Sequence, residues 1–158
     1  MREFTPSTFK RFWSKVDKAG PCWLWTSSLD RSGYGQFFYE GKARSAHRLS
    51  YTQSVGEPEP GLVIDHLCHT PSCVKPSHMR AVTQLLNQEN RRGLPVNNVS
   101  GYRGVYWHKQ RQKWRANVGH AGMKHHVGYF GDLEEAAAAV VQARNSLHQN
   151  NDLDRLHP

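Results

Sequence analysis

A polar, turn-rich segment at residues 94–101 divides this sequence into two halves that follow different patterns. The segment combines proline, asparagine, serine and glycine, which is typical of a linker. Apolar residues make up 37% of the 158 residues. That share lies below the roughly 45–50% of a typical globular domain, so two small cores are favoured over one large core. We therefore expect a first domain at 1–93, a linker at 94–101, a second domain at 102–149 and a tail at 150–158.

The charge of the chain favours a polyanionic partner. Lysine and arginine total 21 against 13 acidic residues, which gives a net charge of +8 and a pI near 9.7. Such a surplus is typical of proteins that bind nucleic acid, although a merely soluble basic protein is the simpler alternative. Residues 97–126 contain six Lys or Arg and no acid, so we expect a strongly positive surface on the second domain.

Several protein classes are disfavoured by what the sequence lacks. No run approaches the ~18 apolar residues of a membrane helix, and the first residues form no apolar signal-peptide core. We therefore expect a cytoplasmic protein without a membrane partner. The three cysteines cannot all pair, which favours a reducing compartment and thiols that lie in the core or bind metal. For Cys22 the default expectation is a buried thiol without a ligand.

The first half alternates short helices and strands. The helical spacing of Phe9, Phe12 and Val16 predicts an opening helix that is capped by Ser7. The following patterns predict a hairpin at 33–44 with its turn at Glu40-Gly41, a helix at 46–55, a strand at 62–64, a helical turn at 76–79 and a helix at 83–90.

The second half predicts a small α+β module. Three strands are expected at 102–107, 114–118 and 126–130, and Asp132 with Glu135 forms a capping box for a long helix. This pattern predicts a three-stranded antiparallel sheet packed on one helix, and the whole chain is expected to be α+β. Three histidines in or beside the last turn are expected at the surface: His120, His125 and His126.

A dense group of metal-binding and titratable residues lies near the middle of the chain. Asp65 and His66 directly follow an apolar strand, and His78 lies thirteen residues after Asp65 at a helical turn. A carboxylate and an imidazole can hold a hydrated divalent cation, Mg²⁺ or Mn²⁺, while the adjacent imidazole takes a proton from water. This chemistry suits phosphodiester hydrolysis. The alternative is that His66 is a core histidine bonded to the backbone.

The cysteines in the same region allow a second kind of metal site. Cys68 and Cys73 have four residues between them, which suits half of a structural zinc site. His69, His78 or Cys22 would supply the remaining ligands.

Several ordered motifs surround these residues. They are Cys22-Trp23-Leu24-Trp25, Gly33-Tyr34-Gly35, Ala46-His47-Arg48-Leu49, Ile64-Asp65-His66-Leu67-Cys68, Cys73-Val74-Lys75-Pro76-Ser77-His78-Met79, Val82-Thr83-Gln84 and Glu89-Asn90-Arg91-Arg92. In this order they resemble the HNH endonucleases of bacteriophages and mobile introns, the ββα-metal nucleases. The resemblance covers roughly residues 9–93 and implies a phage-encoded protein in a bacterial host.

The resemblance also implies roles for individual residues. Asp65 would be a metal ligand, His66 the general base, and His78 stands where the family has its second protein ligand. The middle Asn of the family name is missing, because the matching stretch has Lys75. In the family this Asn orients the catalytic His, and here a backbone carbonyl can orient His66 instead.

The second half carries its own resemblance. Its motifs are Tyr102-Arg103-Gly104-Val105, Lys113-Trp114-Arg115-Ala116-Asn117-Val118, Gly128-Tyr129-Phe130 and Glu134-Glu135-Ala136-Ala137. They are similar to the plant ethylene-response-factor (ERF) DNA-binding domain, whose sheet enters the major groove. Trp114 is the tryptophan more strongly expected in the core. The expected DNA contacts are Arg103, Tyr106, Trp107, Lys113, Arg115 and Lys124, together with Arg91 and Arg92 at the end of the first domain.

Together these features predict a site-specific endonuclease of homing type that hydrolyses double-stranded DNA with one divalent cation. A single active site makes one cut, so nicking and double-strand cleavage both remain open, as do a monomer and a dimer. The alternative is a DNA-binding regulator that never cleaves and whose HNH-like module is a zinc-stapled fold. An RNA-binding function is less favoured, because the strands lack the aromatic pairs of an RNA-recognition sheet.

Overall fold

The computed structural model describes residues 3–90, 94, 96–149 and 151. The chain divides into two compact units, residues 1–84 and 85–158. The expected linker at 94–101 therefore lies within the second unit. Of the expected tail at 150–158, residue 151 alone is among those described.

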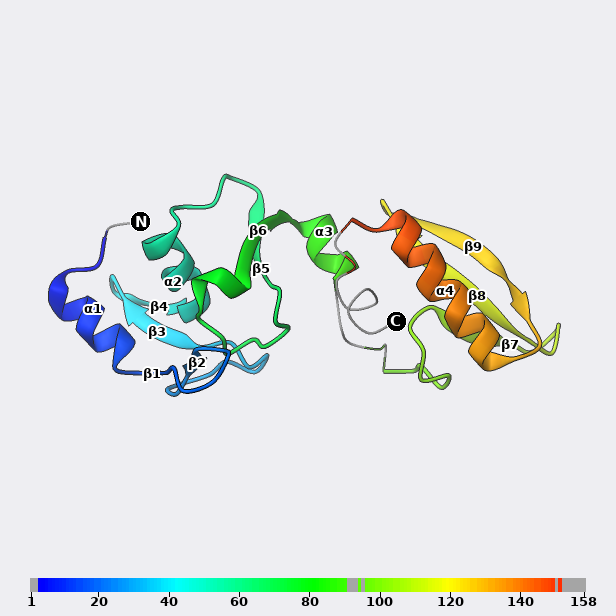
Figure 1. The fold of residues 1–158 in the computed structure, drawn as a ribbon, viewed down its shortest axis with the longest axis horizontal. Coiled ribbons are helices and arrows are strands. Elements are labelled where there is room, and N and C mark those ends of the chain that lie inside the picture. The colour runs from blue at the N-terminus through cyan, green and yellow to red at the C-terminus, as the bar shows by residue number, and fades with distance from the viewer. Residues whose placement is uncertain (1–2, 91–93, 95, 150, 152–158) are drawn as a thin grey trace. The chain divides into compact units, whose positions relative to one another are not determined.

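The first unit is built from short antiparallel pairs of strands and small helices (Figure 1). Strand β1 pairs with β2, β3 with β4, and β5 with β6. Its elements, up to the helix at which the unit ends, are α1 Pro6–Trp13, β1 Val16–Asp17, β2 Leu24–Trp25, β3 Gln36–Tyr39, β4 Lys42–Ser45, α2 Ala46–Ser54, β5 Leu62–His66, the 3₁₀ turn η1 Pro76–His78, β6 Met79–Thr83 and α3 Gln84–Glu89.

Helix α1 begins two residues earlier than its sequence predicts. Thr5, rather than the expected Ser7, is the N-cap, and its hydroxyl accepts the backbone N–H of Thr8 at 3.3 Å. Pro6 occupies the first helical position, where the missing N–H has no intrahelical partner to lose. The helix buries Phe12 completely. This ring packs into an aromatic core with the buried residues Trp25, Phe37, Tyr39, Ala46, Leu49 and Val74.

The hairpin of β5 and β6 carries the residues of chemical interest. Strand β5 continues through Asp65 and His66, which the sequence placed in a loop after the strand. Asp65 lies opposite Arg80 and His66 lies opposite Met79 on β6. Because both residues sit within the strand ladder, their backbones are fixed by the sheet and their side chains are buried.

The second unit is a three-stranded antiparallel sheet in the order β7-β8-β9, with one helix across one face (Figure 1). Strand β8 is central, and Val105, Ala116 and Val118 pack against Ala136 and Val140 of the helix. Asp132 is the N-cap, as expected, and its carboxylate accepts the N–H of Glu135 at 2.9 Å. The elements are β7 Val105–His108, β8 Lys113–His120, β9 Met123–Phe130 and α4 Leu133–Leu147.

The two tryptophans of the sheet divide as expected. Trp114 packs against the core of the second unit, whereas Trp107 is 39% exposed. Among the described helices, none combines the length and the apolar character needed to span a membrane. The small antiparallel sheets and the helices together confirm the predicted mixture of α and β structure.

Candidate metal centre and nucleic-acid interface

Three thiols and one imidazole converge in the first unit. Their ligand atoms all lie within 4.8 Å of one another. The Nδ1 atom of His78 lies 3.5 Å from Sγ of Cys22 and 3.8 Å from Sγ of Cys73. The four residues of this thiol cluster are Cys22, Cys68, Cys73 and His78.

Backbone pairing brings Cys22 to the other members of the thiol cluster. Leu24 forms a bridge with Cys73, and the N–H of Val74 donates to the carbonyl of Trp23 at 2.8 Å. Trp23, which follows Cys22, is therefore hydrogen-bonded to Val74, which follows Cys73. This contact joins segments far apart in the sequence, so local spacing alone could not choose Cys22 over His69 as a member.

The thiol cluster fits a tetrahedral zinc ion. Zinc in proteins binds thiolates at ~2.3 Å and imidazoles at ~2.0 Å, so a tetrahedral arrangement separates sulfur from nitrogen by about 3.5 Å. The distances from His78 Nδ1 to the two sulfurs, 3.5 and 3.8 Å, match this separation. Three soft sulfurs and one imidazole form a donor set that selects zinc over magnesium.

The two neighbouring thiols have opposite pKa shifts. The hydrogen bond from Cys73 lowers the pKa of Cys68, assisted by contacts with Thr70, His78 and Cys22. The same bond and burial raise the pKa of Cys73. Burial opposes the lowering at Cys68. The thiolate is the form of cysteine that binds metal.

Asp65 and His66 have well-defined partners. The Oδ2 atom of Asp65, whose side chain is 8% exposed, accepts hydrogen bonds from Nε and Nη2 of Arg80 at 3.0 and 2.9 Å. The Nε2 atom of His66 lies 2.9 Å from the carbonyl oxygen of Cys73. A carbonyl can only accept, so Nε2 carries a hydrogen, and in the neutral form of the ring Nδ1 keeps its lone pair. The backbone carbonyl of Cys73 is thus a hydrogen-bond partner of the His66 ring.

Two further rings surround His66. Its ring centroid lies 5.0 Å from that of His47 and 5.9 Å from that of Tyr34. Burial lowers the pKa of His47 to about 3, and repulsion from His66 and Arg48 adds to this effect while Asp30 opposes it. His47 is therefore neutral, and its Nδ1 is buried without a hydrogen-bond partner among the described residues.

The structure gives the two expected ligands of the catalytic metal different neighbours. His78 directs Nδ1 toward the sulfurs of the thiol cluster, whereas the carboxylate of Asp65 pairs with Arg80. His69, considered as a zinc ligand, is not a member of the thiol cluster. Cys22, for which a thiol without a ligand is the default expectation and a zinc ligand the alternative, is a member. Cys22 reaches the cluster through the pairing of residues 23–25 with 72–74.

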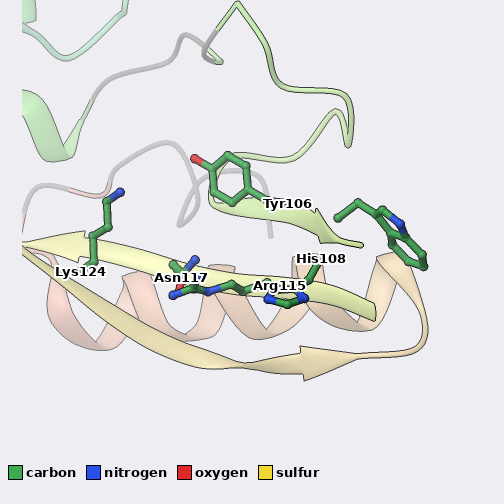
Figure 2. A pocket seen from close by; sticks show the side chains of 6 residues that line it. Tyr106, His108, Arg115, Asn117 and Lys124 are labelled. Carbon is green, nitrogen blue, oxygen red and sulfur yellow. The ribbon is translucent and has the colours of Figure 1, made fainter. Parts of the chain in front are cut away.

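In the second unit, an open groove of about 290 Å³ lies on the sheet. Figure 2 shows Tyr106 and Lys124 projecting from the same side of the sheet. Asn117 accepts hydrogen bonds from Arg115 and His126, both at 3.3 Å. The groove includes four of the expected DNA contacts, and its lining residues are Tyr106, Trp107, His108, Arg115, Asn117 and Lys124.

The remaining expected DNA contacts lie elsewhere. The guanidinium of Arg103 donates to the carbonyls of Glu89 and Gln88 at 3.0 and 3.2 Å, so it binds the end of α3. Lys113 is exposed at the beginning of β8 and does not line the groove. Arg91 and Arg92 lie outside the described residues.

Residues 44–91 match the model of an HNH endonuclease family. This segment contains helix α2, the β5–β6 hairpin and three of the four residues of the thiol cluster. The chain belongs to this family of phage HNH endonucleases.

Two relatives come from Escherichia phage T7. Protein 3.8 is 30% identical over 118 residues, which cover 75% of this chain and 93% of that protein. Protein 7.7 is 32% identical over 69 residues, or 44% of this chain and 53% of that protein. No solved structure gives a significant match. The prediction of a phage-type HNH nuclease is therefore confirmed at the level of the family.

Proposed function

We propose that this protein is a metal-dependent DNA endonuclease in which His66 is the general base and the three-stranded sheet binds the target. The observation that carries the proposal is the hydrogen bond between Nε2 of His66 and the carbonyl of Cys73 at 2.9 Å. It leaves Nδ1 as the basic nitrogen of a histidine that directly follows a carboxylate within strand β5.

In the proposed reaction, Nδ1 of His66 removes a proton from the attacking water. The water oxygen forms a bond to phosphorus, the bond to the leaving oxygen breaks, and that oxygen takes a proton from solvent. A Mg²⁺ or Mn²⁺ ion held through Asp65 would neutralise charge on the phosphate, and such ions need only one or two carboxylates. The neighbouring neutral His47 adds no positive charge that would weaken the base.

The thiol cluster has a structural role in this proposal. Cys73 contributes both a sulfur to the cluster and the carbonyl that orients His66. A zinc ion bound by Cys22, Cys68, Cys73 and His78 would fix that carbonyl and hence the tautomer of His66. Removing zinc is therefore expected to affect cleavage without zinc taking part in the reaction.

The sheet of the second unit is proposed to recognise double-stranded DNA in the manner of ERF domains. A sheet of two or three strands fits the major groove, where Arg115 can pair with guanine and Lys124 can bind phosphate. Both residues line the groove of the sheet. Cleavage at a defined site, as in a homing endonuclease, would follow from this recognition.

Cleavage can be tested on supercoiled plasmid with Mg²⁺ or Mn²⁺, with and without chelator. We expect wild-type protein to nick or linearise the plasmid, and His66→Ala to bind DNA without cutting it. Ser77→Ala is a suitable control, because Ser77 is exposed on the turn beside His78. Cleavage by the His66 variant at the wild-type rate would end the assignment of the base.

DNA binding can be tested with a labelled duplex over a range of salt concentrations. Lys124→Ala should reduce the slope of log K against log salt by about one if this lysine binds a phosphate. Arg115→Ala should weaken binding and relax sequence preference. Lys42→Ala, which removes an exposed charge at β4 of the first unit, serves as the charge-matched control.

The second candidate is a DNA-binding regulator that does not cleave. It is favoured by the pairing of Asp65 with Arg80 and by the position of His78 in the thiol cluster. The plasmid assay separates the two functions, since the regulator would shift the plasmid in a gel and leave it intact at every metal concentration. The phage origin of both relatives supports a phage-encoded protein that acts in an infected bacterium.

A further inference from the structure

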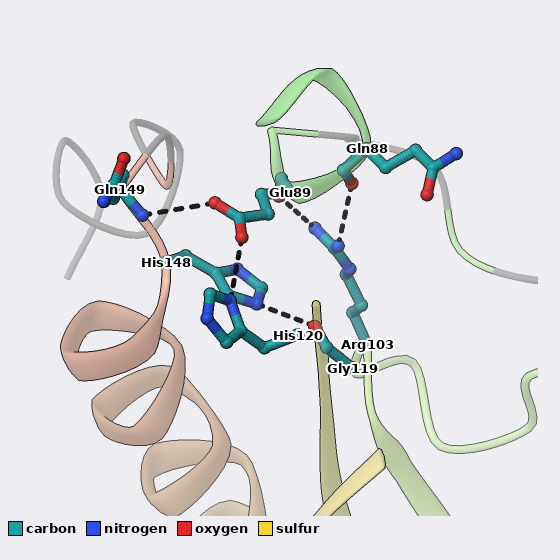
Figure 3. Close-up of polar contacts among 7 residues, drawn as sticks. All are labelled: Gln88, Glu89, Arg103, Gly119, His120, His148 and Gln149. Atoms are coloured by element: carbon teal, nitrogen blue, oxygen red, sulfur yellow. Dashed lines mark hydrogen bonds and ion pairs between the residues drawn. The ribbon is translucent and has the colours of Figure 1, made fainter. Parts of the chain in front are cut away.

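A second group of metal-binding side chains lies in the second unit, where it has no part in the proposed cleavage. Glu89 comes from the end of α3, His120 from the end of β8, and His148 directly follows α4 (Figure 3). One ligand atom from each residue lies within 4.8 Å of the other two. Glu89 and His148 are buried, and the side chain of Glu89 is 3% exposed. The side chain of His120 is 30% exposed.

The carboxylate is oriented by its neighbours. The Oε2 atom of Glu89 accepts the backbone N–H of Gln149 at 3.2 Å. The other oxygen, Oε1, faces the histidines and lies 2.9 Å from Nδ1 of His120 (Figure 3). A buried carboxylate requires a compensating positive charge, which either a protonated histidine or a metal ion can supply.

The tautomer of His148 favours a metal ion over a protonated histidine as the compensating charge. Its Nε2 lies 2.8 Å from the carbonyl oxygen of Gly119, so Nε2 carries the hydrogen and Nδ1 keeps its lone pair. Histidines that bind metals commonly donate their second N–H to a backbone carbonyl or a carboxylate in this way. The rings of His148 and His120 are stacked with centroids 5.7 Å apart, and one nitrogen of each lies within 4.8 Å of the other and of a Glu89 oxygen.

The backbone around these residues is held in place by further contacts. Arg103 donates to the carbonyls of Gln88 and Glu89, which fixes the end of α3. The N–H of His148 donates to the carbonyl of Arg144 at 2.8 Å and closes α4. The side chains thus project from rigid positions, as a preformed metal site requires.

We propose that Glu89, His120 and His148 form a second divalent metal site, with zinc as its preferred ion. Two imidazoles and one carboxylate, with one position left for water, are a donor set that zinc accepts in proteins. The site contains no thiol, which separates it chemically from the thiol cluster of the first unit. Its ion would link the ends of α3, β8 and α4.

The proposal is tested by counting zinc in the full-length protein. After dialysis against buffered zinc, metal analysis should find two equivalents per wild-type chain. An organomercurial reagent blocks thiols, so it should release the equivalent bound by the thiol cluster and leave the other. Glu89→Gln and His148→Ala should each bind one equivalent, all of it released by the reagent.

The matched control is His126→Ala, which removes a histidine from the same sheet whose Nδ1 contacts Asn117 instead. It should retain two equivalents. Glu89→Gln preserves the size of the side chain, and circular dichroism checks that each variant is folded. Cobalt provides a second readout, because the non-thiol site should add visible absorbance without a thiolate charge-transfer band.

Release of all zinc from wild-type protein by the organomercurial would overturn the proposal. Two equivalents in folded Glu89→Gln would do the same. Either result would mean that Glu89 and His120 contact each other without binding a metal ion at this group. None of these measurements uses DNA cleavage, so the metal site and the proposed nuclease function can fail independently.

Discussion

The buried, neutral His47 should make the first unit sensitive to acid. In the folded state its pKa is lowered to about 3 by burial, from an ordinary value of 6.5. Below pH 6.5 the unfolded chain takes up a proton at this site and the folded chain does not, so stability falls as the pH is lowered toward 3. pH 5 lies 1.5 units below the pKa of 6.5 in the unfolded chain. At 1.36 kcal/mol per unit, the free energy of unfolding is therefore about 2 kcal/mol lower at pH 5 than at neutral pH. This loss is absent above pH 6.5.

Replacing His47 with a residue that does not titrate should remove this part of the pH dependence. We would measure the free energy of unfolding of the first unit by urea denaturation at pH 7 and pH 5, with the same zinc concentration throughout. The decrease between the two pH values should be about 2 kcal/mol smaller in His47→Phe than in wild type. His47→Gln is the second variant, because it removes the same titration but packs differently against His66 and Tyr34. If both variants lost as much stability as wild type between pH 7 and pH 5, burial of a neutral His47 would not be the cause of the acid sensitivity.

Three further substitutions test individual contacts, each by urea denaturation. Ser50→Ala should cost about 1–3 kcal/mol, because the buried hydroxyl donates to the carbonyl of Val74 at 2.6 Å; a loss below about 0.5 kcal/mol would contradict this. Gly104→Ala should cost about 3 kcal/mol or more, since φ is +88° and a Cβ would lie 2.5 Å from the carbonyl oxygen of Asn117. Asp132→Ala should cost about 1 kcal/mol through loss of the N-cap, and Asp132→Asn should restore most of it.

The elements that could be predicted from the sequence are those specified by neighbouring residues. The turn at Glu40-Gly41 joins β3 and β4, and both residues have positive φ values, 49° and 76°. Asp132 caps α4 through a residue only three positions away. Such signals depend on a few adjacent residues, so they can be recognised from the sequence alone.

The metal-binding groups depend on contacts between distant segments, and here prediction from sequence was incomplete. The pair Cys68 and Cys73 was recognised from its spacing, but the choice among Cys22, His69 and His78 depended on which strands pair. Glu89 and His120 belong to different elements, and His120 was expected at the surface. No spacing rule connects residues brought together by the packing of a helix end on a sheet.

The bridge between Leu24 and Cys73 also constrains when the first unit can fold. During synthesis, this contact cannot form until residue 73 has left the ribosome, whereas β2 can pair with β1 as soon as residue 25 has emerged. The second unit instead pairs β7 with β8 and β8 with β9, each joined by a short turn. Contacts of greater sequence separation form more slowly, so the bridge that brings Cys22 to Cys73 is expected to form after the local strand pairs of both units.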